Sequence, residues 1–159
     1  MAEEIERKFL VRSDRWRPPP DGGTRFRQGY LSTEPERVVR VRLAGDSAYL
    51  TIKGPTVGVR RLEFEYPIPP ADAETMLDLL CLRPLIEKTR YLVPWQGRTW
   101  EIDVFEGDNA GLTMAEIELP SADAELALPP WVDREVSDDP RYFNSNLARR
   151  PYQLWRDDA

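Results

Sequence analysis

The chain has 159 residues, enough for one domain with a sizeable core, and its 41% hydrophobic and 31% charged content is typical of a soluble globular protein. Its net charge of −6 argues against nonspecific nucleic-acid binding, and no apolar run approaches the roughly 20 residues of a membrane span. The sequence contains no histidine, which excludes Ser-His and Cys-His nucleophile pairs and nearly all usual zinc sites. Acid–base or metal chemistry therefore falls to carboxylates, lysine, tyrosine or bound water.

The first predicted strand, residues 3–11, carries two glutamates and a lysine at alternate positions. Because successive side chains of a strand point to opposite faces, Glu4, Glu6 and Lys8 share one face. Two carboxylates at this spacing can bind a hard cation such as Mg²⁺ or Mn²⁺, and the lysine can contact an anion that the metal holds. A single pattern of this kind is more often a solvated charged face, so its meaning depends on the rest of the chain.

Seven further segments alternate charged and apolar residues with the period of a strand. Turn signals such as Gly45-Asp46 and Gln96-Gly97 separate several of them into hairpins. The segments are residues 24–32, 37–43, 48–53, 59–68, 85–93, 98–105 and 112–119.

Helical spacing appears in two longer segments. Residues 71–82 form an amphipathic pattern with Pro69-Pro70 before it and Pro84 after it, and residues 142–149 form a final helix that Pro151 stops. We also expect a short helical turn from Ser13 to Trp16, ended by Pro18 to Pro20 and followed by a loop over 21–23, and a short helix over 121–126. We expect one domain over residues 1–159, with its core at about 3–147 and a peripheral tail at 152–159.

The charged residues at two-residue spacing nearly fill one face of every predicted strand. The acids are Glu4, Glu6, Glu63, Glu65, Glu101, Asp103, Glu116 and Glu118, and the bases are Lys8, Arg25, Arg27, Arg40, Arg42, Lys53, Arg61, Lys88 and Arg90. A solvated sheet face usually mixes Thr, Ser, Gln and Lys, whereas here whole strands carry one sign of charge. Like charges side by side cost stability unless a counter-charge relieves them, so we expect a ligand on this face.

Eight strands suffice to close a barrel that holds one small ligand. The predicted fold is therefore mainly β (α+β): an eight-stranded antiparallel β-barrel, or tunnel, with flanking helices. If the charged face points inward, the acids would hold divalent cations and the bases a polyanion with several phosphates. The helices would then cover the apolar outer face. The alternative is an open sheet whose charged face lies in water.

Eight segments, in order, resemble the CYTH-domain proteins, also called triphosphate tunnel metalloenzymes. They cover residues 3 to about 147: Glu4 to Lys8, Gln28 to Leu31, Arg40 to Arg42, Thr51 to Gly54, Glu63 to Glu65, Glu87 to Tyr91, Trp100 to Asp103, and Ala115 to Glu118. The resemblance implies a tunnel that hydrolyses a triphosphate with Mg²⁺ or Mn²⁺, and two divalent ions.

The resemblance also implies roles for individual residues. The metal ligands would be Glu4, Glu6, Asp103, Glu116 and Glu118, with Glu63 and Glu101 as helpers. The phosphate-binding residues would be Arg40, Arg42, Lys53, Lys88 and Arg90, with Arg61, Arg25 and Arg27 as further candidates. For each residue the alternative is an internal salt-bridge network that only neutralises the lumen.

Our mechanistic hypothesis gives the two metals different tasks. One bridges phosphate oxygens and neutralises developing charge, and the other lowers the pKa of the attacking water. Lys8 would orient or deprotonate that water if neighbouring cations lower the pKa of its ammonium group. A simple contact between Lys8 and phosphate is the alternative.

The substrate is inferred from the short single-domain form, which most resembles bacterial tripolyphosphatases. The cyclase subgroup carries a His-Phe pair before its first glutamates, and none is present here. An organic triphosphate such as thiamine triphosphate or a nucleoside triphosphate stays open, because Tyr30 and Tyr49 could stack on an organic moiety. Two further alternatives are a non-catalytic polyphosphate- or nucleotide-binding module and a structural β-protein.

The remaining expectations concern location and partners. The start of the chain has no signal-peptide pattern, and the single Cys81 lies in an apolar helical pattern typical of a small core residue. We therefore expect a cytoplasmic protein whose partner is a small polyanionic triphosphate, with no nucleic acid and no membrane. Some members of the family dimerise, so a homodimer stays open.

Overall fold

The computed structural model describes residues 2–17 and 22–158. The predicted proline stop at Pro18 to Pro20, and Asp21 in the predicted loop, lie outside the described residues. Within the described part, eight long strands alternate along the chain with the turns that the sequence predicts. They are β1 (Glu3–Val11), β2 (Thr24–Ser32), β3 (Val38–Ala44), β4 (Ser47–Lys53), β5 (Arg60–Pro67), β6 (Ile86–Trp95), β7 (Arg98–Phe105) and β8 (Thr113–Glu118).

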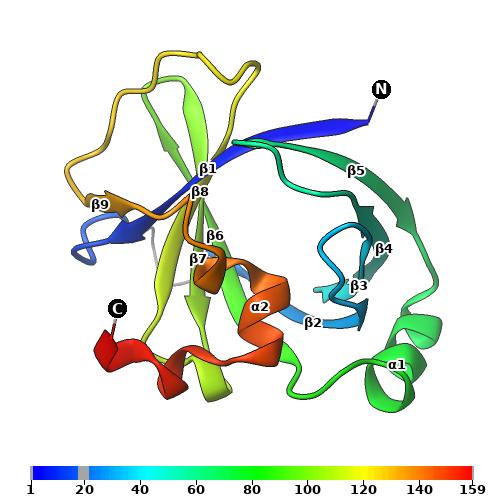
Figure 1. Ribbon diagram of the computed structural model, residues 1–159. Helices are drawn as coiled ribbons and strands as arrows, with labels where there is room; N and C mark the ends of the chain where they lie inside the picture. Colours follow the sequence, from blue (N-terminus) through cyan, green and yellow to red (C-terminus); the bar gives the residue numbers. More distant parts are fainter. Residues whose placement is uncertain (1, 18–21, 159) are drawn as a thin grey trace.

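These strands close into an antiparallel barrel, as the sequence predicts. Their order is β5-β4-β3-β2-β6-β7-β8-β1, and the start of β1 pairs with β5 to complete the ring (Figure 1). The register places Gln28 opposite Arg42 and Tyr30 opposite Arg40, so these four side chains share one face. Because that face points into the ring, the barrel is charged inside and apolar outside.

A helix covers the apolar outer face of β3 and β4. Helix α1 (Pro70–Leu79) buries Ala73 and Leu77 against Val41 and Ala48 of these strands. Cys81 belongs to the same cluster, as expected for a small core residue. The prediction that this helix reaches residue 82 is wrong. The chain leaves helical geometry after Leu79, and the backbone N–H of Leu82 donates to the carbonyl of Tyr30 in β2 instead.

An aromatic cluster covers the outer face of β1, β7 and β8. Trp16, Trp100 and Trp131 are buried there with Phe9, and a short ninth strand, β9 (Val132–Glu135), pairs with the end of β1. The sequence did not predict β9. The short helical turn expected from Ser13 to Trp16 is a single hydrogen-bonded turn, in which the N–H of Arg17 donates to the carbonyl of Asp14, and the short helix expected over 121–126 is a turn followed by irregular chain.

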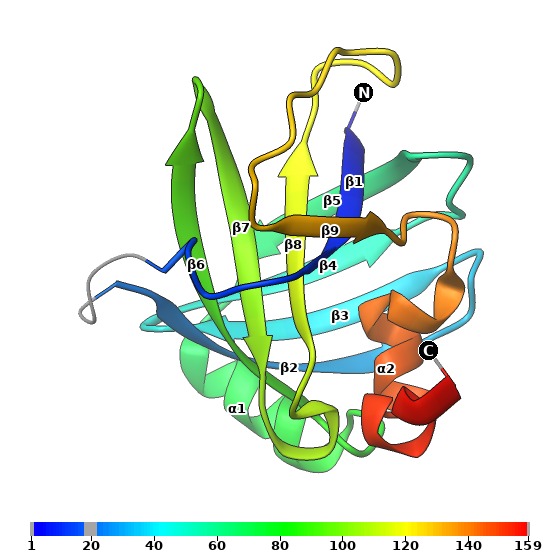
Figure 2. The ribbon, with the colours of Figure 1, turned by 90° about the vertical axis from the view of Figure 1, so that its left-hand side faces the viewer.

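The C-terminal segment closes one end of the barrel (Figure 2). Helix α2 (Asn144–Arg149) buries Leu147 and Ala148 against the ends of the strands. The tail is not peripheral throughout: Gln153, Leu154 and residues 156–158 are exposed, but Trp155 is 3% exposed and packs edge-on against Tyr142 and Tyr152. Single 3-10 turns connect these parts: η1 (Gly107–Asn109), η2 (Pro140–Tyr142), η3 (Tyr152–Leu154) and η4 (Arg156–Asp158). None of the described helices is long and apolar enough to cross a membrane.

Candidate active site

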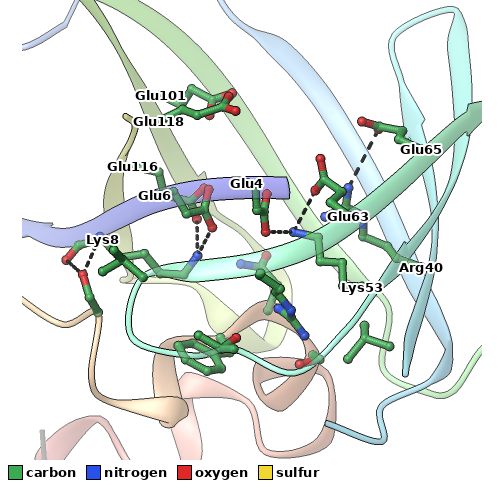
Figure 3. Close-up of a pocket in the computed structure, with 18 of the residues that line it drawn as sticks. Glu4, Glu6, Lys8, Arg40, Lys53, Glu63, Glu65, Glu101, Glu116 and Glu118 are labelled. Carbon is green, nitrogen blue, oxygen red and sulfur yellow. Dashed lines mark hydrogen bonds and ion pairs between the residues drawn. The ribbon is translucent and has the colours of Figure 1, made fainter. Parts of the chain in front are cut away.

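A cavity of about 200 Å³ occupies the interior of the barrel (Figure 3). Twelve of the thirteen principal candidate residues line it: Lys8, Arg40, Arg42, Lys53, Arg61, Lys88, Arg90, Glu4, Glu6, Glu63, Glu116 and Glu118. Glu65 and Glu101 line it as well. The pleat of eight strands thus brings together side chains that are far apart in the sequence.

The cavity has two walls of opposite charge, each made of four neighbouring strands. We call β4, β3, β2 and β6 the cationic wall; its charged lining is Lys53, Arg40, Arg42, Lys88 and Arg90. We call β7, β8, β1 and β5 the acidic wall; its carboxylates on the cavity are Glu101, Glu116, Glu118, Glu4, Glu6, Glu63 and Glu65. Lys8 and Arg61 are the bases on the lining of the acidic wall.

The two arginines of β3 donate hydrogen bonds to neutral groups, and Arg40 also lies 3.9 Å from the carboxylate of Glu65. Nε of Arg42 donates to Oε1 of Gln28 at 2.8 Å, and Nη2 of Arg40 donates to Oγ1 of Thr51 at 3.2 Å. Nε of Arg40 is buried without a hydrogen-bond partner in the described part of the chain. Burial, followed by repulsion from Arg40 and Arg90, lowers the pKa of Arg42 to about 9. This part of the cavity therefore carries positive charge that an anion would stabilise.

Asp103 joins the two walls where β6 pairs with β7. Its carboxylate accepts from Nζ of Lys88 at 2.7 Å and from Nε and Nη2 of Arg90 at 2.7 and 2.8 Å. Although burial alone would raise it, Arg90 and Lys88 hold the pKa of Asp103 well below its usual range. Asp103 is fully buried and lies behind the two cations rather than on the cavity lining.

On the acidic wall, two glutamates of β1 are paired with lysines (Figure 3). Nζ of Lys8 lies 2.6 Å from Glu6 and 3.4 Å from Glu116, and Nζ of Lys53 lies 2.8 Å from Glu4. Burial would lower the pKa of Lys8, but Glu116 and Glu6 outweigh it and raise that pKa. The expected lowering assumed cationic neighbours, and it is not found because the neighbours of Lys8 are carboxylates.

Several carboxylates of the acidic wall face one another across neighbouring strands. Glu6 is the cross-strand partner of Glu118, and Glu101 is the partner of Glu116. Burial, followed by the charges of Glu4 and Glu6, raises the pKa of Glu118. Such repulsion is what a divalent cation relieves, and carboxylate oxygens are the donors that Mg²⁺ and Mn²⁺ prefer.

In the present side-chain arrangement the acids are spread along the wall. Within residues 2–17 and 22–158, no group of three or more Asp, Glu, Cys or His side chains is gathered closely enough to hold a metal ion. The donor chemistry fits a hard cation, but the pairs of Glu6 with Lys8 and of Glu4 with Lys53 would have to open first.

Arg25 and Arg27, the further phosphate-binding candidates on β2, point outward. Arg25 pairs with Glu87 and Glu106, and Arg27 lies 3.5 Å from Asp78. Their strand neighbours point inward instead, with Phe26 under the guanidinium groups of Arg42 and Arg90 at 4.6 and 5.0 Å from the ring centre. The pairing of Gln28 with Arg42 determines which face of β2 points inward, and the sequence of β2 alone does not show which face that is.

The C-terminal segment contributes cavity residues that the sequence reasoning missed: Ser137, Phe143, Asn144 and Ser145. They lie in a short helix and the loop before it, which have no strand alternation. Tyr30, which the sequence suggests as a wall or stacking residue, also lines the cavity.

The chain resembles proteins of known name over nearly its whole length. The CYTH domain model matches residues 2–152. A protein of Acetivibrio thermocellus named inorganic triphosphatase is 46% identical over 157 residues, which span 99% of this chain and 100% of the relative. A second protein of that name, from Nitrosomonas europaea, is 39% identical over 91% of this chain and 96% of its own length. A crystal structure of an inorganic triphosphatase matches with a TM-score of 0.66 and 35% identity over 93% of this chain and 95% of that chain.

Proposed function

The chain belongs to the CYTH domain family, and on that basis we propose that it hydrolyses inorganic tripolyphosphate to pyrophosphate and phosphate in its charged tunnel. It is a triphosphate hydrolase, like its relatives, which are named inorganic triphosphatase. The observation that carries the proposal is the division of one small cavity into a cationic wall and an acidic wall. A compact polyanion and hard cations together would neutralise both.

The cationic wall is the proposed phosphate clamp. Arginine presents a planar fork that matches phosphate oxygens, and lysine acts as a point charge. Arg40 and Arg42 are buried, and their hydrogen bonds are to neutral groups, so their charge is available to a ligand; the carboxylate of Glu65 lies 3.9 Å from Arg40. The other proposed phosphate contacts are Lys53, Lys88 and Arg90 of this wall and Arg61 of β5 on the acidic wall.

The acidic wall is the proposed metal site, with Mg²⁺ or Mn²⁺ as the ion and two ions per tunnel. Glu4, Glu6, Glu116 and Glu118 are the proposed ligands, and Glu63 a further one. Asp103 fits this role less well, because both of its oxygens already accept from Lys88 and Arg90. When bound, such an ion would neutralise phosphate charge and acidify a bound water.

Lys8 is proposed to act as an ammonium group at the boundary between the two ligands. Its Nζ lies between Glu6 and Glu116, so a cation at those carboxylates would free its N–H groups for a phosphate oxygen or the attacking water. In the overall reaction a P–O bond to water forms, the bridging P–O bond to pyrophosphate breaks, and the proton of water passes to the products or solvent.

The test is phosphate release from tripolyphosphate with Mg²⁺, beside ATP and thiamine triphosphate. We expect fast release from tripolyphosphate alone and a loss of about 100-fold or more in Glu6→Gln, which removes one proposed metal ligand. Glu135→Gln is the matched control, because Glu135 pairs with Arg7 outside the cavity. Preference for an organic triphosphate would overturn the substrate, and tight binding without turnover would indicate a binding module.

A further inference from the structure

Two side-chain amides lie against the cationic wall and connect it to the C-terminal helix. Gln28 of β2 donates through Nε2 to Oδ1 of Asn144 at 3.1 Å and accepts from Nε of Arg42 at 2.8 Å. The same Oδ1 of Asn144 accepts from Nζ of Lys88 at 2.9 Å. One arginine and one lysine of the cavity, Arg42 and Lys88, are therefore joined through these two amides.

Gln28 is buried completely, with 0% exposure, and it does not line the cavity. Burying an amide costs free energy unless it is hydrogen-bonded, and Gln28 has partners for both ends of its amide: Arg42 on one side, Asn144 and the hydroxyl of Tyr30 on the other. An apolar side chain would fill the same space without that requirement. The amide of Gln28 is therefore better explained by its hydrogen bonds to Arg42 and Asn144 than by packing.

The backbone beneath Gln28 is fixed as well. A Cβ on the next residue, Gly29, would lie 2.7 Å from Cβ of Cys81 and 2.8 Å from Cδ2 of Leu85. Such contacts are too short, so β2 approaches the segment after α1 as closely as only glycine permits. Gln28 consequently has a rigid base from which to orient its neighbours.

The hydrogen bond that Arg42 donates to Gln28 determines which nitrogens of Arg42 face the cavity. Within the described part of the chain, the one hydrogen bond that Arg42 donates is from Nε to Gln28. Its terminal Nη groups are therefore left for a ligand, and the ring of Phe26 supports the guanidinium plane at 4.6 Å. Asn144 does the same for Lys88, whose other partner is Asp103.

We propose that Gln28 and Asn144 are positioning residues, which hold Arg42 and Lys88 in the orientation that binds the phosphates of the substrate. This inference rests on the proposed function, in which both cations contact the polyanion. It assigns a role to the Gln28 segment of β2, and it makes α2 part of the binding site rather than only a plug.

The first measurement is steady-state hydrolysis of tripolyphosphate by Gln28→Leu. Because the lost hydrogen bond involves a charged group, we expect KM to rise by about tenfold. We expect kcat to change less than about twofold, since the interaction positions bound substrate equally before and during reaction. Asn109→Ala is the matched control: Asn109 is also a buried amide, 1% exposed, but it holds the backbone N–H of Tyr152 outside the cavity. It should lower the melting temperature without raising KM.

A double-mutant cycle separates positioning from a general structural effect. If Gln28 acts through Arg42, then Gln28→Leu should not raise KM further in an Arg42→Met background. A full additional increase in the double variant, or an unchanged KM in Gln28→Leu alone, would overturn the positioning role and leave the proposed function intact. An unchanged KM in Arg42→Met would instead overturn both the positioning role and the proposed phosphate contact of Arg42, whereas hydrolysis itself is tested by phosphate release from the native protein.

A second cycle decides the question if Gln28→Leu does not fold. Asn144 is only half-buried, so Asn144→Ala is a milder change, and its partner variant is Lys88→Met. We expect Asn144→Ala to raise KM in the native background and to have no effect once Lys88 is replaced. Equal effects in both backgrounds would contradict the proposal.

Discussion

The arginines of β3 on the cationic wall and the glutamates of β1 on the acidic wall hold their charges with different kinds of partner. On the cationic wall, Arg42 is bound by an amide and Arg40 by a hydroxyl group. On the acidic wall, Glu6 and Glu4 are bound by the ammonium groups of Lys8 and Lys53. These hydrogen bonds to neutral groups leave the charge of Arg42 uncompensated and that of Arg40 opposed by Glu65 at 3.9 Å, whereas the lysines cancel the negative charge of the glutamates until something displaces them.

The difference indicates how ready each wall is for its ligand. An anion can bind Arg42 without displacing a charged group, and at Arg40 it competes with Glu65 at 3.9 Å. A cation must first separate Lys8 from Glu6 and Lys53 from Glu4, and it gains most if those lysines then find phosphate oxygens. The arginines of β3 are therefore more nearly prepared for the polyanion than the glutamates of β1 are for the metal.

The largest expected effect comes from neutralising Asp103, the fully buried carboxylate that joins the two walls. Asp103→Asn keeps the shape of the side chain but removes the carboxylate that pairs with the buried Lys88, and it leaves Arg90 to pair with Glu101 and Glu116. Breaking a buried ion pair in this way costs about 3–5 kcal/mol, so we expect urea denaturation to give a free energy of unfolding lower by that amount.

The control for this loss is an ion pair outside the tunnel. Glu135→Gln removes the carboxylate that Arg7 binds at 2.7 Å on the surface, and an exposed pair of this kind contributes about 0–1 kcal/mol. If both substitutions cost the same, the contrast between buried and exposed charge would not hold in this protein.

The second prediction tests the unequal readiness of the walls by thermal unfolding. Tripolyphosphate with a chelator present should raise the melting temperature by about 5–10 °C at a concentration 100-fold above its Kd. Mg²⁺ alone, at millimolar concentration, should raise it by no more than about 2 °C, because it must displace lysines before it binds. Arg40→Met should abolish the first shift. A larger shift with Mg²⁺ alone than with tripolyphosphate alone would reverse the comparison.

The strands and the charged interior could be predicted from the sequence because both depend on local alternation. Residues 98–105, for example, carry Glu101 and Asp103 opposite Trp100 and Ile102, and they form β7 with the predicted bounds. Turn residues at each end fix such a strand to within one or two positions. That the charged face points inward followed from its nearly complete ionisation.

The features that the sequence did not predict depend on contacts between distant segments. Strand β9 has only four residues, and its partner on β1 lies more than 120 positions earlier in the chain. Trp155 is buried by Tyr142 and Tyr152, which no pattern in the tail indicates. The bond between Gln28 and Asn144 spans 116 positions, so the second layer of the site becomes visible only in three dimensions.

The smallest expected effects are changes in melting temperature. They should have opposite signs for a carboxylate of the acidic wall and for a carboxylate of a surface ion pair. The pKa of Glu118 is raised, so ionising it as the pH rises costs the folded state free energy. Without metal, Glu118→Gln should therefore melt about 1 °C higher than the native protein at pH 7, and the difference should disappear at pH 3, where the native carboxyl is also neutral.

Asp139 should behave in the opposite way, because hydrogen bonds from Arg141 lower its pKa. Its stabilising effect is present above the pKa of the unfolded chain and is lost as the pH falls through the lower pKa of the folded state. Asp139→Asn should therefore melt about 1–2 °C lower than the native protein at pH 7, with the difference shrinking toward pH 2. Melting curves of both variants from pH 2 to pH 7 provide the measurement. Differences of the same sign would mean that the carboxylates of the acidic wall do not repel one another, and the argument for a cation at that wall would lose its electrostatic basis.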